Sequence, residues 1–420
     1  MQPLTWEPGS PATRIAEEEE IVGHLAWPRD WDEAPANGNR RALEGLERLV
    51  RLGLPFRIEN GARRFDPYEV FYFMRWAHHR HDDPLWAEAV DIARGYPAEY
   101  RLREGMDVEF ELLFEREIEL RGPPFHTHFP LPADDSHQQI TVIDPLKGTA
   151  CSSQTVGHVL DVQASGSPVS FGVRVGCKVR WRGERIDAAR VDPFRELEPS
   201  DKRYVNECEG PIRVTKQIRQ LSSELARDSQ TPWDAIQRFW RFLFSRLVFG
   251  RIHPHLLSAQ DPLWSVIESG RSDCYFGSAL LAGLCRARGI PARLVSGYFL
   301  YRRFQANHWW VEALVPPYGW VPCDLWTWIP ADGNPDSDWG DLFLGRLDPR
   351  LVIERFPRSH IVLEPRSARP TYTLQRVSGE GVEIIVRDLE RSTQVYLDRV
   401  SFLRRSFPDA ARGKDSTRST

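Results

Sequence analysis

The chain has 420 residues, of which 41% are hydrophobic and 27% charged, and its formal net charge is −4 with a sequence pI near 6.3. This weak negative charge excludes the broad electrostatic attraction by which proteins bind nucleic acid or anionic membranes, so neither is expected as a principal partner. No apolar run approaches the ~20 residues of a membrane span, and the first segment has neither a basic nor an apolar signal region, so a cytoplasmic location is expected.

Residues 1–100 are expected to form an irregular lead-in followed by a small helical unit. Residues 1–35 contain Pro, Gly and a run of four Glu, a pattern typical of a solvated surface. After them, "RRALEGLERLVRLG" has leucines at helical spacing and ends on Gly. The segments "DPYEVFYFMRWAHHR" and "DPLWAEAVDIARGYP" each open with Asp-Pro, which favours a helix start.

Residues 101–195 are predicted to form a β-sandwich-like domain. Three runs alternate between apolar and polar residues over strand lengths: "MDVEFELLFEREIEL", "HQQITVID" and "SFGVRVGCKVRWRG". Clusters of Pro, Gly and Asp separate these runs, as is typical of turns between strands.

Helical periodicity returns in residues 205–345, which are expected to form a second unit. The segments "IRVTKQIRQLSSELARD" and "TPWDAIQRFWRFLFSRLVF" have apolar residues at helical spacing, and Thr231 or Ser229 can cap the second helix ahead of a proline. Beyond this unit, residues 346–407 are predicted to be a β-rich C-terminal extension, and residues 408–420 a disordered tail.

The segment "GRSDCYFGSALLAGLCRARGIPARLVSGY" places one cysteine, Cys274, at the mouth of an apolar helix. Gly289 and Pro291 end this helix in the expected way, and Ser272 or Asp273 can cap its start. Cys274 therefore lies in the first turn, where unpaired backbone N–H groups and the positive end of the helix dipole favour a thiolate. A nucleophilic cysteine is typical of such a position.

Two further residues complete a candidate catalytic set. The runs "ARLVSGYFL", "HWWVEALV" and "GWVPCD" predict an antiparallel sheet packed on the helix. His308 opens the second strand and Asp324 closes the third, so the two residues lie side by side if these strands pair through the "PPYG" turn. A thiolate on a helix tip, an imidazole and an orienting carboxylate are the groups that acyl transfer through a thioester requires.

The chemistry assigns a role to each of these residues. Cys274 attacks a carbonyl, His308 holds the thiolate as an ion pair and later protonates the leaving group, and Asp324 fixes the tautomer of His308. The backbone N–H of Cys274, at the helix start, is a candidate oxyanion donor.

A structural interpretation of the same residues stays open. The chain has six cysteines and no CxxC pair, so neither a disulfide framework nor a zinc knuckle is indicated, and most cysteines are expected to be reduced and buried. A single cysteine, or a single histidine on a strand, is more often a core residue. The placement of all three residues at the ends of a helix and two strands favours the catalytic interpretation.

At these residues the sequence resembles the transglutaminase-like superfamily, whose pattern is a Cys opening a long helix, then a His-x-Trp-Val-Glu strand and a Gly-Trp-x-x-x-Asp strand. The matching stretches are "SDCYFGSALLAGLCRARGIPARLVSGY", "NHWWVEALV" and "GWVPCDLW", and the resemblance covers about residues 209–330. It implies a papain-like fold with Cys274 as nucleophile, His308 as acid/base and Asp324 as its orienting residue. The strand-rich region near 105–190 is similar to the β-domain that precedes the core in many bacterial-type members.

Two positions depart from the family pattern. Ser272 stands where a Gly usually precedes the cysteine by two residues, and "LWTW" follows Asp324 where Pro-Thr or Pro-Ser is common. The first departure concerns the tightness of the turn before the cysteine, and the second concerns the shape of the acceptor side.

The expected fold class is α+β: a papain-like transglutaminase core, in which the helix bearing the cysteine packs on an antiparallel sheet, preceded by a helical segment and a β-sandwich-like domain.

The expected function is cysteine-dependent acyl transfer on an amide carbonyl of a peptide, a protein or a small molecule. Hydrolysis is favoured because water needs no second binding site. Transfer to an amine acceptor is one alternative, and a non-catalytic binding module on the same fold is another. The sequence leaves the oligomeric state open.

Aromatic residues near the candidate set are possible substrate-binding groups. Trp264 and Tyr275 are candidates for a second oxyanion donor. Trp309 and Trp310, with other tryptophans of the same strands, could wall a tunnel for an extended peptide or an acyl-amide chain, although core packing is the commoner use. Those other tryptophans are Trp320, Trp326 and Trp328.

No cofactor and no metal are expected. "DGNPDSDWGD", residues 332–341, spaces Asp and Asn like a calcium loop but lacks the Gly of the sixth position and the Glu of the twelfth. The histidine clusters at 78–81, 126–128 and 253–255 have no Cys or carboxylate partner at a recognised spacing, so ordinary histidines are favoured. The sequence has no phosphate-binding Gly-rich loop and no dinucleotide fingerprint.

Overall fold

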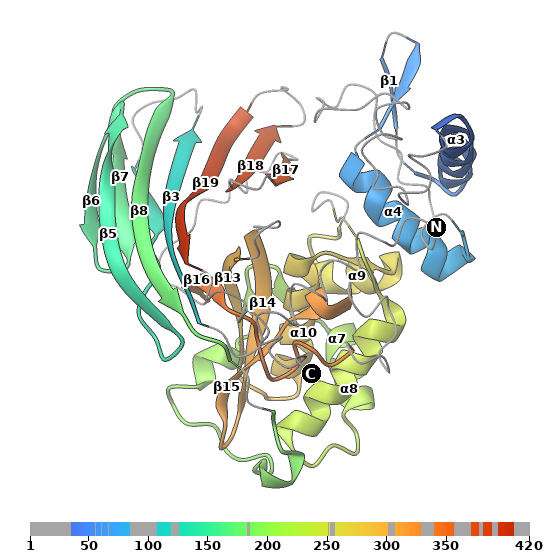
Figure 1. Cartoon of the computed structure of the whole chain (residues 1–420). Helices are drawn as coiled ribbons and strands as arrows, with labels where there is room; N and C mark the ends of the chain where they lie inside the picture. Colours follow the sequence, from blue (N-terminus) through green and yellow to red (C-terminus); the bar gives the residue numbers. More distant parts are fainter. Residues whose placement is uncertain are drawn as a thin grey trace, which may run out of the picture.

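The computed structural model describes three parts of the chain that pack on one another: a helical N-terminal unit, a β domain and a mixed core (Figure 1). Nearly all of the segment expected to form a third N-terminal helix, most of the calcium-like segment and the predicted disordered tail lie outside the described residues. The described residues are 35–54, 56–59, 61–65, 67–84, 107–118, 126–182, 185–250, 252, 257–300, 307–328, 340–356, 371–377, 381–388 and 394–406.

Within the described residues, the N-terminal unit contains two helices joined by a β-hairpin. The helices are α3 (Pro35–Arg51) and α4 (Pro67–His81), and the hairpin pairs β1 (Arg57–Glu59) with β2 (Ala62–Arg64). Two of the three helices that the sequence predicts in this region are confirmed, and their apolar residues share one buried core. That core includes Leu46, Leu49, Phe65, Phe73, Trp76 and, from the mixed core, Val248.

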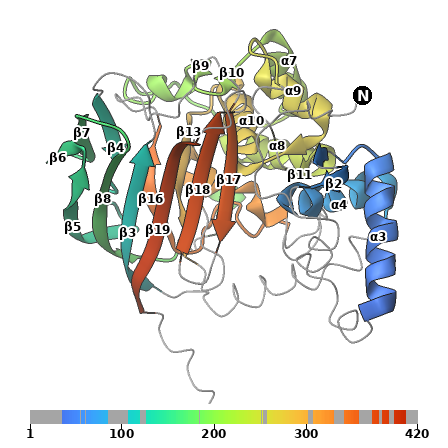
Figure 2. The same cartoon turned by 90° about the horizontal axis from the view of Figure 1, so that it is seen from above.

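The β domain is built from two antiparallel sheets. The strands of the larger sheet are β3 (Val108–Ile118), β5 (Gln138–Thr149), β8 (Val169–Val179), β17 (Thr371–Val377), β18 (Gly381–Asp388) and β19 (Gln394–Ser406). Those of the smaller sheet are β4 (His126–Pro130), β6 (Cys151–Val156) and β7 (Val159–Ala164). Their orders are β17-β18-β19-β3-β8-β5 and β4-β7-β6, as Figures 1 and 2 show. Along β3 the side chains alternate between buried and more exposed, as the sequence pattern predicts.

The strands after residue 346 do not form one extension, contrary to the prediction for 346–407. β16 (Arg350–Arg355) joins the sheet of the mixed core, whereas β17, β18 and β19 continue the larger sheet of the β domain beside β3 (Figure 2). There Arg116 of β3 lies opposite Asp398 of β19, with 2.6 Å between Nη2 and Oδ2. Alternation indicates which face of a strand is buried but not which strand lies beside it, so the sequence could not place these strands.

The mixed core contains four helices of the described chain. These are α7 (Lys216–Leu225), α8 (Pro232–Arg246), α9 (Pro262–Ser269) and α10 (Cys274–Ala287). Thr231 caps α8, because its Oγ accepts a hydrogen bond from the backbone N–H of Asp234 at 3.2 Å. This contact decides between the two capping residues that the sequence left open. None of the helices in the described part of the chain is long and apolar enough to cross a membrane.

A four-stranded antiparallel sheet lies between α10 and the β domain (Figure 1). Its strands are β13 (Ala292–Phe299), β14 (Asn307–Val315), β15 (Gly319–Cys323) and β16, in the order β15-β14-β13-β16. One face packs on α10, and from the other face Tyr298 and Leu351 enter the core of the β domain. The expected α+β fold class, with a cysteine-bearing helix packed on an antiparallel sheet, is therefore confirmed.

Candidate active site

Cys274 is the first residue of α10. Asp273 caps the helix: its Oδ1 accepts a hydrogen bond from the backbone N–H of Phe276 at 2.8 Å, which decides between the two caps that the sequence allowed. The Cys274 side chain is half-buried against the main hydrophobic core. Although burial raises the pKa of the Cys274 thiol, the backbone of Trp309, on β14, acts to lower it, and Ser278 of α10 donates a hydrogen bond from its Oγ to the Trp309 carbonyl at 3.2 Å. The strand that begins at Asn307 therefore lies directly beside the thiol.

The turn before Cys274 accommodates Ser272 in place of the usual Gly. Ser272 is fully buried in β12 (Arg271–Ser272), which runs parallel to β11 (Val248–Phe249). Gly277 of α10 faces it, and a Cβ built on Gly277 would lie 2.6 Å from the Ser272 Oγ. The room that a Gly before the cysteine would leave is thus provided by a Gly in the following helix.

The N-terminal unit packs on this turn from outside. The guanidinium of Arg271 lies 5.8 Å from the ring centroid of Phe73 and 5.7 Å from that of Trp76, both on α4. Arg80, also on α4, donates a hydrogen bond to the backbone carbonyl of Arg246 at the end of α8. The helical unit therefore contacts the segments that lead into α10.

His308 and Asp324 meet in a buried pair. β14 and β15 are antiparallel neighbours, and the His308 Nε2 lies 2.8 Å from the Asp324 Oδ1. Both side chains are almost completely buried, with exposed fractions of 3% and 1%. Because Nε2 faces the carboxylate, Nδ1 is the ring nitrogen that remains to exchange a proton with a thiol. The structure thus brings these two residues together as the strand pattern predicts.

Arg350 and Asp348 extend this pair, and no sequence pattern indicates either of them. The Arg350 Nη1 forms an ion pair with the Asp324 Oδ2, and its Nε donates to the Asp348 Oδ1 at 2.7 Å. The backbone N–H of Trp326 donates to the Asp324 Oδ1 at 2.9 Å. Arg350 belongs to β16, which has no motif of its own, so a signal for this contact would require knowledge of the strand order.

Aromatic rings enclose the charged groups of the pair. The His308 imidazole stacks on Phe299, with 4.2 Å between ring centroids and 26° between the planes. The Arg350 guanidinium lies 4.5 Å from the Phe299 centroid and 4.8 Å from that of Phe343. These rings exclude water, so the ion pair between Arg350 and Asp324 is stronger than it would be at a surface.

The electrostatic surroundings set the protonation states. Burial lowers the pKa of His308 below its usual range, and the attraction of Asp324 offsets this only in part. Burial raises the pKa of Asp324, but Arg350 and then His308 outweigh it and bring that pKa to about 2. For Cys274, burial and next the carboxylate of Asp273 raise the thiol pKa.

These shifts favour a resting site with a thiol, a neutral imidazole and a carboxylate. The sequence suggested a thiolate–imidazolium ion pair instead, on the basis of the helix dipole. A helix N-terminus typically contributes about 0.3–1 kcal/mol, which is less than the roughly 1.4 kcal/mol of one pKa unit. Desolvation and the neighbouring carboxylate of Asp273 are the larger effects on Cys274.

The four aromatic candidates for substrate contact have different surroundings. The Trp264 Nε1 donates to the Glu268 Oε1 at 3.1 Å within α9, so this donor is already used and the oxyanion assignment is not supported. Trp310 is fully buried, with its ring stacked behind His308 at 6.4 Å, so it is a core residue and not a substrate-facing one. Tyr275 and Trp309 are half-buried and pack edge to face at 4.7 Å. These two remain candidates.

The other three tryptophans do not line one surface together. Trp320 lies under the Arg293 guanidinium at 4.0 Å and packs against Tyr204, near the end of the sheet opposite His308. Trp326 is buried against Phe299. The side chain of Trp328 and the segments 301–306 and 329–339 lie outside the described residues, so an aromatic tunnel stays a prediction.

Glu312, the last residue of the "HWWVE" stretch, has a structural role that the sequence did not suggest. It is 1% exposed and binds three arginines: Arg182 at 2.8 Å, Arg293 at 2.6 Å and Arg355 at 3.0 Å. These arginines come from the segment that leaves the β domain, from β13 and from β16. Glu312 therefore joins three separate parts of the chain.

The three histidine clusters have different environments. His78 lies 3.0 Å from the backbone carbonyl of Asp83, and His81 packs edge to face on Trp76, as ordinary histidines do. Residues 253–255 lie outside the described residues. In the 126–128 cluster the structure brings a carboxylate, Asp161, beside the imidazoles, which the sequence spacing did not indicate.

Part of the chain is similar to a known protein family and to solved structures. Residues 219–325, which include all three candidate catalytic residues, match the family described as the transglutaminase-like superfamily. A protein of Cytophaga hutchinsonii described as a candidate cysteine protease is 12% identical, with 71% of this chain and 98% of that chain covered and a TM-score of 0.44. The periplasmic domain of TgpA from Pseudomonas aeruginosa is 18% identical, with 58% and 92% covered and a TM-score of 0.32. No curated protein matches the chain.

Proposed function

We propose that this chain, whose residues 219–325 form a transglutaminase-like core, transfers acyl groups from an amide or peptide carbonyl through a thioester on Cys274. The observation that carries this proposal is the buried contact of His308 with Asp324, at 2.8 Å, on the strand β14 that packs on the helix beginning with Cys274. A thiol, a base and a group that orients the base are the parts that covalent acyl transfer needs.

The first half of the reaction forms the acyl-enzyme. As the Cys274 sulfur attacks the carbonyl carbon, the thiol proton passes to the His308 Nδ1, and the Asp324 carboxylate stabilises the resulting imidazolium. The backbone N–H of Cys274, in the first turn of α10, donates to the developing oxyanion. The C–N bond then breaks, the leaving amine takes the proton from Nδ1, and a thioester remains.

The second half releases the acyl group. A water molecule attacks the thioester carbonyl and gives a proton to the His308 Nδ1; the C–S bond breaks, and the sulfur recovers its proton from the imidazolium. The products are a carboxylic acid and the free enzyme. Hydrolysis is the preferred outcome because water needs no acceptor site, and an amine attacking the same thioester would give a new amide instead. The substrate is a peptide, a protein or an amide-containing small molecule, and a cytoplasmic site of action remains part of this proposal.

The first test is the rate of iodoacetamide alkylation at each cysteine, followed by mass spectrometry between pH 6 and 9 in the native protein and in His308→Ala. We expect the rate at Cys274 to fall at least about tenfold in the variant, because the base that removes the thiol proton is gone. The exposed Cys208 is an internal control and should react equally in both proteins. If Cys274 reacts no faster than the buried Cys285 and Cys323, the thiol is not activated and the binding-module alternative takes the lead.

A second experiment separates hydrolysis from transfer. Peptide amides with a chromogenic leaving amine are incubated with the enzyme, with and without glycinamide as acceptor, and the products are identified by mass spectrometry. Mainly carboxylic acid in the presence of millimolar glycinamide would support a hydrolase. Mainly the glycinamide adduct would support the transferase alternative, and Cys274→Ala should give neither product.

A further inference from the structure

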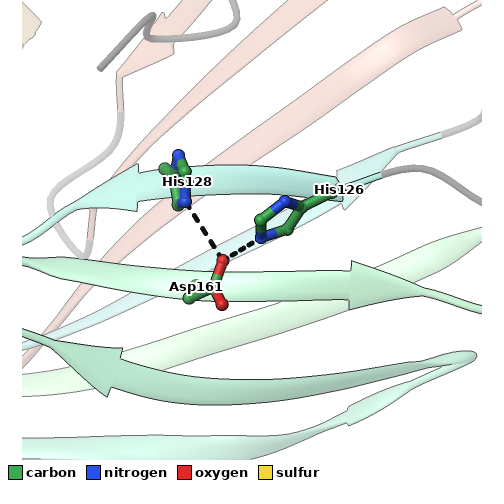
Figure 3. Close-up of side chains that lie close together, drawn as sticks. All are labelled: His126, His128 and Asp161. Carbon is green, nitrogen blue, oxygen red and sulfur yellow. Dashed lines mark hydrogen bonds and ion pairs between the residues drawn. The ribbon is translucent and has the colours of Figure 1, made fainter. Parts of the chain in front are cut away.

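We propose that His126, His128 and Asp161 form a binding site for a divalent transition metal of the zinc type, on the smaller sheet of the β domain (Figure 3). The site is separate from the candidate active site. In Figure 1, β6 and β7 lie on the side of β8 that faces away from α10. The inference therefore stands independently of the proposed acyl transfer.

The antiparallel pairing of β4 with β7 brings the three side chains together. His126 and His128 are two residues apart on β4, so both point to one face of the sheet. Asp161 of β7 lies directly opposite His128 in the register. The His128 Nε2 is 3.1 Å from the Asp161 Oδ1, and the His126 Nε2 contacts the same oxygen. All three ligand atoms lie within 4.8 Å of one another.

This arrangement fits the coordination preferences of zinc. Zn²⁺ binds His nitrogen and Asp oxygen at about 2.0–2.1 Å in a tetrahedron, which places neighbouring ligand atoms about 3.3 Å apart. The distance of 3.1 Å between the His128 Nε2 and the Asp161 Oδ1 is close to this spacing, and water can complete the fourth position. In the absence of metal, each Nε2 can carry a proton toward the carboxylate, and Zn²⁺ takes the place of these protons. Two imidazole ligands disfavour Ca²⁺ and Mg²⁺, which prefer oxygen.

The site combines a fixed carboxylate with accessible imidazoles. The Asp161 side chain is 12% exposed, whereas those of His126 and His128 are 53% and 36% exposed. Asp161 is flanked in β7 by Leu160 and Val162, which are fully buried in the core of the β domain and fix its backbone. Gln154 of β6 approaches the second oxygen, Oδ2, at 3.5 Å, which leaves Oδ1 to the histidines. A metal bound here would cross-link β4 to β7.

The test uses full-length protein with the Cys274→Ala substitution, so that the candidate nucleophile cannot bind metal. The metal-stripped protein is titrated with ZnCl₂ against a chromophoric chelator. We expect one tight equivalent, and a loss of at least about tenfold in affinity when His126→Gln or Asp161→Asn removes a ligand. His158→Ala is the matched control, because it removes an exposed imidazole from the β6–β7 turn of the same sheet and should leave the affinity unchanged.

Two further measurements distinguish specific coordination by these three ligands from non-specific binding by surface histidines or by the exposed Cys208. Co²⁺ in place of Zn²⁺ should give a visible tetrahedral absorption band that is lost in His126→Gln. Zinc should raise the unfolding temperature of the parent protein but not that of His126→Gln, because only metal bound to the folded state stabilises it. Circular dichroism establishes that the variants are folded. Equal affinity in parent and ligand variants, or no binding at all, would overturn the proposal and leave a hydrogen-bonded cluster only.

Discussion

Among the charged residues outside the candidate catalytic pair, Arg350 most affects the ionisation of His308 and Asp324. Its guanidinium lies between Asp324 and Asp348, beneath three aromatic rings, and its side chain is fully buried. Arg350 lowers the pKa of Asp324 and also that of His308. In the proposed reaction Arg350 touches neither the thiol nor the substrate, so it is a positioning residue that acts through Asp324.

Replacing Arg350 by Met should change both the rate and the pH profile of Cys274 alkylation. Loss of the positive charge raises the pKa of His308, and the imidazole accepts a proton from the thiol only while it is neutral. The acidic limb of the profile should therefore move to higher pH, and the rate at pH 7 should fall by about tenfold or more. Arg350→Lys keeps the charge. It should return the acidic limb of the profile close to its native pH but should restore the alkylation rate less completely. An unchanged limb in Arg350→Met would contradict this role.

A control for this experiment is Arg174→Met, which removes an exposed arginine of the β domain and should leave the profile unchanged.

The contrast between Arg350 and the three candidate catalytic residues also shows what the sequence could predict. Cys274, His308 and Asp324 stand at ends of a helix and two strands, and those ends can be read locally. Arg350 reaches Asp324 only because β16 pairs with β13, and no local pattern encodes that partner.

At the scale of elements, the junction of β12 with α10 determines where the thiol sits. Ser272 and Gly277 are in contact across this junction. The Ser272 side chain occupies the space that a side chain on residue 277 would need. A Cβ on Gly277 would also lie 3.1 Å from the Leu325 Cδ1. The helix can therefore approach β12 this closely only with glycine at residue 277.

Gly277→Ala should destabilise the protein although Ala favours helices. Helix propensity contributes about 1 kcal/mol in favour of Ala, whereas overpacking against a buried neighbour typically costs about 1–3 kcal/mol. We expect a lower free energy of unfolding in urea and slower alkylation of Cys274. Adding Ser272→Ala should recover part of the loss, because the Oγ is the atom in closest contact, and Ser272→Ala alone should have a smaller effect. If the change in unfolding free energy of the double variant equals the sum of the changes in the two single variants, this coupling is contradicted.

The pairing of elements was predictable only where the connection is short. The "PPYG" turn joins β14 to β15 directly, so their pairing and the meeting of His308 with Asp324 followed from the sequence. β19 pairs with β3, more than 270 residues earlier, and their alternating patterns carry no information about this partner. The same reason explains why Asp161 was not recognised beside the 126–128 histidines.

At the scale of the whole molecule, Glu312 connects the β domain to the catalytic sheet. Its carboxylate is buried, and its pKa lies below the ordinary value of 4.5. Burial raises this pKa, but the attraction of Arg355, Arg182 and Arg293 lowers it by more. Arg355 also binds Asp135, which belongs to the loop before β5 of the β domain. One buried carboxylate therefore fixes three cations around the boundary between the two parts.

Glu312→Gln should destabilise the whole protein, and the loss should depend on pH. A neutral amide leaves three guanidinium groups close together without the buried anion, so at pH 7 we expect a loss of about 3 kcal/mol or more in urea unfolding. Since the folded pKa lies below the unfolded one, the stabilisation by Glu312 is fully present above about pH 4.5 and is lost as the pH falls further. The difference in unfolding free energy between the native protein and the variant should thus become smaller as the pH falls from 5 to 3. Glu207→Gln, which breaks the exposed pair with Arg219, should cost about 1 kcal/mol or less. A constant difference across this range would mean that the carboxylate charge is not what holds the two parts together.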